Sequence, residues 1–171
     1  MKLGIDTCTW LKITHFGSDP VDVFRLVTEG FQFFTTEDVL RECLFHLPEK
    51  EEFFKDLELF KRLDKKFEYY RKLGFDEADA SLLEYSDTEA NDNPDHAYVI
   101  ITEDPQMLLQ NTFGFLKVIR LIDWLVQLGR QTLLEERSLA RIAKRLYDTR
   151  NITKRKLKAV HQEFQHSAQV Y

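Results

Sequence analysis

Short runs of β-forming residues alternate along this chain with longer stretches that carry a helical pattern of apolar residues. The runs "KLGID" at 2–6, "FQFFTT" at 31–36 and "AYVIIT" at 97–102 are short and rich in β-branched and aromatic side chains. Strands separated by helices pair in parallel, because each helix returns the chain across the sheet. The alternation therefore predicts an α/β fold with a central, mainly parallel sheet.

The segments between these runs carry signals that begin and end helices. Asp19 and Pro20 begin a helix that ends at Gly30, and Thr35 or Thr36 caps a second helix that Pro48 closes. Further helices are expected over 76–90, 105–111 and 123–129, with a fourth strand over 115–122.

The segment 49–73 has apolar residues at intervals of three to four positions. These are Phe53, Leu57, Phe60, Phe67 and Tyr70. That spacing predicts one long charged helix, which Gly74 ends.

The C-terminal part has two apolar stripes at helical spacing, so it is expected to form a helical hairpin. The stripes are Leu139, Ile142 and Leu146, then Leu157, Val160 and Phe164. The predicted architecture is a three-layer α/β/α domain over 1–128, followed by a basic helical extension over 129–171 that packs on or beside it.

Composition excludes several classes of protein. Among the 171 residues, no apolar run approaches the roughly 18 to 20 that a membrane helix needs, so we expect a cytoplasmic protein without membrane association. Cys8 and Cys43 are too few for a disulfide scaffold and lack zinc-site spacing, so reduced thiols are expected.

The charged residues are unevenly distributed along the chain. Residues 131–171 hold nine Lys/Arg against four Asp/Glu, whereas residues 1–130 hold 15 Lys/Arg against 25 Asp/Glu. The body is acidic and the C-terminal part is basic.

Acidic residues follow the predicted strands. Asp6 ends the first strand and Asp104 lies just beyond the third, while Glu42 and Asp79 lie on helices that begin near the same edge. In an open parallel sheet, ligands bind outside the carboxyl ends of the strands. We therefore expect these four carboxylates to face one pocket.

Such a cluster requires a cation. At an effective dielectric constant near 20, two carboxylates about 5 Å apart repel by about 3 kcal/mol. Oxygen ligands without His or Cys favour a hard ion such as Mg²⁺ or Mn²⁺, which can activate a water against a phosphorus atom. The acids therefore predict phosphodiester hydrolysis.

Four stretches carry a family resemblance. "IDTCTW", "TTEDVLREC", "GFDEADASLLEYS" and "VIITEDPQML" resemble, in order, the four acidic motifs of the PIN-domain nucleases, over about residues 1–128. The resemblance implies a metal-dependent endoribonuclease that cleaves single-stranded RNA, either as a toxin with an antitoxin-like protein inhibitor or in RNA processing. It implies Asp6, Glu42, Asp79 and Asp104 as catalytic metal ligands, with Thr7 and Thr102 as supporting hydroxyls.

Other interpretations of these acids stay open. Asp6 is also suited to a strand-end turn, and Asp104 to capping the helix that follows it. Asp87 gives a more usual spacing to the fourth motif than Asp79, although "ADASLL" at a helix start favours Asp79. An aspartyl phosphotransferase would need an acid at the position of Cys8.

The basic C-terminal residues allow three interpretations: a solvated helix face, contact with RNA phosphates, or docking on a partner such as a second copy of the chain. A non-catalytic nucleic-acid-binding or scaffolding protein is therefore the alternative function. The candidate RNA-binding residues are Arg137, Arg141, Lys144, Arg145, Lys154, Arg155, Lys156 and Lys158.

Overall fold

The computed structural model divides the chain into two compact units, which are described separately. It describes residues 1–13, 31–48, 51–54, 57–63, 66–93, 95–110, 116–131 and 133–165. Unit 1 is Met1–Leu11 with Gly30–Leu121, and unit 2 is Lys12–Glu29 with Ile122–Tyr171. The helix predicted over 19–30 lies outside the described residues.

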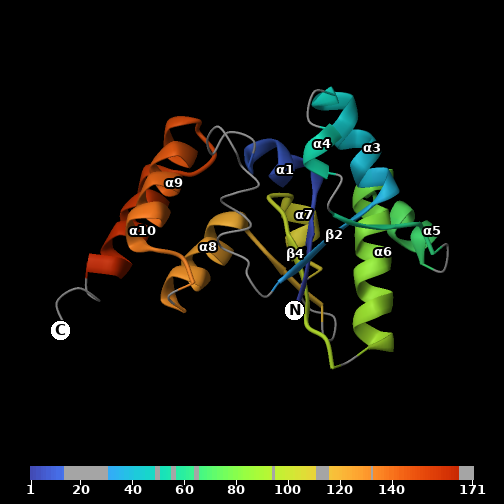
Figure 1. Ribbon diagram of the computed structural model, residues 1–171. Coiled ribbons are helices and arrows are strands. Elements are labelled where there is room, and N and C mark those ends of the chain that lie inside the picture. Colours follow the sequence, from blue (N-terminus) through green and yellow to red (C-terminus); the bar gives the residue numbers. More distant parts are fainter. Residues whose placement is uncertain are drawn as a thin grey trace. The chain divides into compact units, whose positions relative to one another are not determined.

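Unit 1 is built on a five-stranded sheet in which every pair of neighbouring strands is parallel (Figure 1). The central strand β1 pairs with β2 on one side and β4 on the other. With its flanking helices and the C-terminal helices, this sheet confirms the predicted three-layer α/β/α fold class. The strands are β1 (Lys2–Ile5), β2 (Gln32–Thr36), β3 (Glu58–Phe60), β4 (Tyr98–Ile101) and β5 (Leu116–Ile119), in the spatial order β3-β2-β1-β4-β5.

The strand order creates a switch point beside β1. The chain moves outward from β1 through β2 to β3, and then returns to the other side of β1 for β4 and β5. Connections that leave neighbouring strands in opposite directions open a crevice at the carboxyl ends of those strands. The residues that follow β1 and β4 therefore line the place where such a sheet binds ligands.

Helices of unit 1 pack on the sheet and on one another. The longest of them, α6, contacts β2, β4 and β5 and also packs against α3 and α5, which Figure 1 shows beside it. Thr36 caps α3 by accepting a hydrogen bond from the Val39 amide (3.3 Å), and its hydroxyl is 2.6 Å from that of Ser81 on α6. The helices are α1 (Thr7–Ile13), α3 (Glu37–His46), α4 (Glu51–Phe54), α5 (Phe67–Lys72), α6 (Glu77–Asp92) and α7 (Pro105–Leu108).

Close packing of α6 on the sheet depends on Gly4. A Cβ at this position of β1 would lie 2.7 Å from Cζ of Phe34 and 3.0 Å from Cδ1 of Leu82. Both contacts are too short for carbon atoms, so a larger residue would force these buried side chains apart.

The prediction of one long helix over 49–73 is wrong. Its described residues form α4, then β3, then α5. The strand β3 pairs with β2 and forms one edge of the sheet. The Phe60 ring stacks on Tyr85 at a centroid distance of 4.1 Å and meets Phe34 edge-on at 5.9 Å. Partners from β2 and α6 override the local helical spacing, because they partly bury Phe60 and give the backbone of β3 a strand to pair with.

Two smaller differences concern element ends. The chain enters α1 at Thr7, directly after β1, where no helix was predicted. The fourth predicted strand is shorter than expected, because β5 ends at Ile119 and the next helix starts at Leu121.

Unit 2 is helical in its described residues. It contains α8 (Leu121–Arg130), whose first residue closes unit 1, followed by α9 (Glu136–Asp148) and α10 (Lys154–Gln165), which pack against each other. The α9 stripe Leu139, Ile142 and Leu146 is buried, as is Val160 on α10. Within the described parts of the chain, no helix has the length and apolar character needed to cross a membrane.

Candidate active site at the carboxyl edge of the sheet

Asp6 occupies the position directly after β1 and is 1% exposed. Its Oδ1 accepts a hydrogen bond from the Thr9 amide (2.8 Å), which caps the first turn of α1. Its Oδ2 accepts a hydrogen bond from the hydroxyl of Thr102, directly after β4. The carboxylate is therefore held in a fixed orientation across the switch point between β1 and β4.

Glu42 approaches from the neighbouring connection. It lies on α3, half-buried, and its Oε2 accepts a hydrogen bond from the Thr7 hydroxyl at 2.8 Å. Thr7 and Thr102 thus each donate to one of the predicted acids, in the positions expected for supporting hydroxyls. The two threonines orient Glu42 and Asp6 without adding charge.

Asp79 lies in the first turn of α6, as predicted. Asp76 caps this helix by accepting a hydrogen bond from the Asp79 amide (2.9 Å). The pKa of the Asp79 carboxyl is raised to about 8, first by burial and then by repulsion from Asp76, Asp6, Asp104 and Glu42, in that order. The structure therefore brings the four predicted acids within electrostatic range of one another.

Asp104 performs the capping role that the sequence left open. Its Oδ1 accepts hydrogen bonds from the amides of Gln106 (2.6 Å) and Met107 (3.3 Å), at the start of α7. Its own amide donates to the Thr102 hydroxyl oxygen at 2.9 Å. Thr102 therefore links Asp6 and Asp104 through a single side chain.

Asp87, the alternative third acid, is held elsewhere. Its Oδ2 accepts hydrogen bonds from the Lys66 ammonium (2.6 Å) and the Tyr70 hydroxyl (3.0 Å). It is not among the main causes of the raised pKa of Asp79, whereas Asp6, Asp104 and Glu42 are. These contacts favour Asp79 as the member of the acidic group.

The two cysteines are free thiols. Cys43 is buried beside Glu42, and burial raises the pKa of its thiol to about 12, with the charges of Glu42 and Asp6 as further contributions. Cys8 is exposed. A thiol with such a raised pKa stays protonated at neutral pH, so Cys43 is poorly suited to act as a nucleophile.

The fit of a metal ion is set by the spacing of these acids. In the described ranges, no group of three or more His, Cys, Asp or Glu residues is gathered closely enough to hold a metal ion directly. The donor chemistry nevertheless suits a hard cation, because the group offers carboxylate and hydroxyl oxygens and carries repulsion that a cation would relieve. An ion bound by this group would therefore have to keep water between itself and several of the carboxylates, as Mg²⁺ commonly does.

Two of the predicted RNA-binding residues are already paired within unit 2. The Lys144 ammonium binds both carboxylate oxygens of Asp148, at 2.5 and 2.6 Å, and Lys156 forms an ion pair with Asp123 on α8. Arg141 donates to the Ser138 hydroxyl at 3.4 Å. The others are exposed and have no side-chain partner among the described residues; they are Arg137, Arg145, Lys154, Arg155 and Lys158.

Comparisons of this chain with protein-family models, with curated proteins and with solved structures found no match. The fold and the acids define the candidate site by their geometry alone: a parallel α/β sheet with carboxylates at its switch point.

Replacing Asp79 with Asn is expected to stabilise the metal-free protein, and more so at high pH. The folded pKa of about 8 lies above the value of about 4 for an unfolded Asp. Between these values the folded state retains a proton that the unfolded state has lost, so stability falls as pH rises and levels off above about 8. Asn does not ionise, so the gain should reach about 2–4 kcal/mol near pH 8 and be smaller near pH 5.

Urea denaturation of both proteins in the presence of a chelator measures this difference. Asp87→Asn is the matched control, since it removes a carboxylate that Lys66 and Tyr70 stabilise and should lower stability. A gain for Asp79→Asn that does not change with pH would contradict the electrostatic assignment.

Proposed function

We propose that this chain is a divalent-metal-dependent endoribonuclease that cleaves single-stranded RNA in the cytoplasm, with Mg²⁺ or Mn²⁺ as its cofactor. The observation that carries the proposal is the group of four acids at the switch point of a parallel sheet, in which burial, together with repulsion from Asp76, Asp6, Asp104 and Glu42, raises the pKa of Asp79 to about 8. A carboxylate group of this kind is costly unless a cation offsets it.

Each acid has a distinct role in this proposal. Asp6 would hold the ion, since the Thr9 amide and the Thr102 hydroxyl fix both of its oxygens. Glu42 would orient water on the α3 side, and Asp104 on the β4 side. Asp79, whose pKa is raised by burial and by the neighbouring acids, would return to its charged form and hold water when a cation offsets that repulsion.

The bound ion would supply charge neutralisation at the phosphodiester and a more acidic water. The residues of the chain supply orientation. Because Thr7 and Thr102 hold Glu42 and Asp6 by hydrogen bonds, little reorganisation is needed when the substrate binds.

The proposal is tested by incubating the full chain with an end-labelled single-stranded RNA. We expect cleavage with MgCl₂ or MnCl₂, none with a chelator, and no cleavage of a duplex DNA of the same sequence. We also expect Mg²⁺ to raise the melting temperature, because it binds the folded state alone. RNA that stays intact in both metals, or cleavage that persists in the chelator, would contradict the proposal.

A second candidate is a nucleic-acid-binding protein without catalysis, and the unpaired cations of α9 and α10 favour it. Its binding to RNA would be sensitive to salt but indifferent to metal. Titration of labelled RNA with and without the chelator therefore separates the two candidates.

A further inference from the structure

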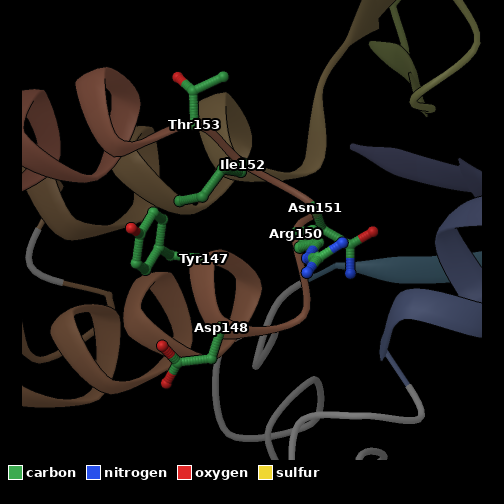
Figure 2. Close-up of a pocket in the computed structure, with 6 residues that line it drawn as sticks. All are labelled: Tyr147, Asp148, Arg150, Asn151, Ile152 and Thr153. Carbon is green, nitrogen blue, oxygen red and sulfur yellow. The ribbon is translucent and has the colours of Figure 1, made fainter.

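Unit 2 contains a cavity of about 390 Å³ at the turn between α9 and α10. Figure 2 shows the six residues that line it, all from the last turn of α9 and the connection to α10: Tyr147, Asp148, Arg150, Asn151, Ile152 and Thr153. A volume of this size lies at the lower end of the range for small-molecule sites, which is roughly 300–1,000 Å³.

The charge of the lining is positive. Asp148 is neutralised by Lys144, which binds both of its carboxylate oxygens. The Arg150 guanidinium is exposed and has no partner in the described part of the chain. Lys154 and Arg155 follow a few residues later, also without partners there, so the unpaired charges that the described residues place near this turn are positive.

Arg150 lines the cavity at a backbone position where Gly is the common residue. The turn ends α9 with hydrogen bonds from the Arg150 amide to the Tyr147 carbonyl (2.9 Å) and from the Asn151 amide to the Leu146 carbonyl (2.7 Å). This arrangement requires a left-handed residue, and Arg150 has φ of 61°. The backbone conformation of the turn therefore fixes the position from which the Arg150 side chain extends.

The remaining lining groups suit a base and a sugar. The Tyr147 ring is half-buried and lies next to the Ile152 side chain in Figure 2, so one side of the cavity is aromatic and apolar. Asn151 and Thr153 add an amide and a hydroxyl. A guanidinium for phosphate, an aromatic face for a base and neutral polar groups between them are the elements that hold nucleotides in proteins.

We propose that the cavity at the α9–α10 turn binds a nucleoside monophosphate unit, with Arg150 contacting the phosphate and Tyr147 contacting the base. The unit is either a free mononucleotide or one nucleotide of an RNA chain. This site lies wholly within unit 2 and uses none of the acids of unit 1. Binding therefore requires neither a metal ion nor cleavage.

Arg150→Gly is the decisive variant, because it removes the guanidinium and places at φ of 61° the residue that adopts this conformation without strain. Folding should be retained or improved, with a higher melting temperature. Affinity should fall about tenfold. Arg120→Ala is the matched control: it removes an exposed arginine of unit 1 that has no side-chain partner in the described part of the chain, and it should change affinity less than about twofold.

Titration calorimetry in the presence of a chelator measures this binding with adenosine 5′-monophosphate, inorganic phosphate and short RNAs with and without a 5′-phosphate. We expect the mononucleotide to bind more tightly than phosphate, and Tyr147→Leu to reduce that difference. Binding of AMP without RNA assigns a free nucleotide, binding of RNA only when 5′-phosphorylated assigns a chain end, and binding of both RNAs assigns an internal nucleotide.

Three results would overturn the proposal. These are the absence of saturable binding by AMP and by both RNAs, unchanged binding by Arg150→Gly, and an equal loss in Arg120→Ala. Since no cleavage is measured and no metal is present, each result is independent of whether unit 1 is a nuclease.

Discussion

Replacing Asp6 with Asn is expected to lower metal-dependent RNA cleavage on the order of 10²–10³-fold while the fold is retained. The substitution keeps the Oδ1 acceptor for the Thr9 amide and leaves a polar group facing Thr102, so the cap of α1 and the link to β4 persist. It removes one negative charge from the group that surrounds Asp79. With one carboxylate fewer, the acidic group should bind a cation less tightly and orient it less well.

Cleavage rates and melting temperatures with and without Mg²⁺ measure this effect. The rise in melting temperature that Mg²⁺ gives the original protein should shrink in Asp6→Asn. Asp87→Asn is the control, because it removes a carboxylate from the same sheet face that Lys66 and Tyr70 hold away from the group. The assignment of Asp6 as a metal ligand would be excluded if the Asp6→Asn variant cleaved RNA at the original rate. It would also be excluded if the Asp87→Asn variant lost as much cleavage as Asp6→Asn.

Replacing Glu84 with Ala is expected to destabilise unit 1 by about 3–5 kcal/mol. Glu84 is fully buried on α6, and its carboxylate accepts hydrogen bonds from three backbone amides: Lys66 (2.8 Å), Phe67 (3.2 Å) and Leu63 (3.2 Å). These amides belong to the connection between β3 and α5. Ala would leave them without this acceptor and would also leave a cavity beside α6.

Urea denaturation followed by tryptophan fluorescence measures this loss. Trp10 lies in unit 1 and Trp124 in unit 2, so a Trp124→Phe background reports unit 1 alone. Glu77→Ala is the matched control on the same helix; its exposed carboxylate is 3.8 Å from Arg62, and its loss should cost less than about 1 kcal/mol. Equal losses of stability in the two variants would show that the buried, hydrogen-bonded carboxylate of Glu84 contributes no more than the exposed carboxylate of Glu77.

Local sequence signals located β1, β2, β4 and β5 and the residues that follow them. The apolar runs that become β1 and β4 place Asp6, Thr102 and Asp104 at strand ends, and Asp76 with Asp79 marks the start of α6. These features depend on neighbours within a few positions along the chain, where side-chain alternation and capping act. The signal for the Lys144–Asp148 pair, at four residues' separation, was also present in the sequence.

Contacts between residues far apart in the sequence determined the features that local patterns did not predict. Phe60 fits a helical stripe by spacing, yet β3 forms because β2 offers a free edge and Tyr85 a stacking surface. Lys66 and Tyr70, which come from that same misassigned segment, hold Asp87 and so distinguish it from Asp79. Glu84 was not recognised as a structural acid, because the three amides that it binds lie 17 to 21 residues away.

The sequence by itself determined that this chain is an α/β protein with acids at the ends of its strands and basic C-terminal helices, since both follow from periodicity and residue order. The tertiary structure decided which acids surround Asp79, which cations of unit 2 are already paired, and where α9 and α10 leave a cavity. The physical reason is range: capping and amphipathicity act over a few residues, whereas burial and Coulomb repulsion depend on side chains that only the fold brings together.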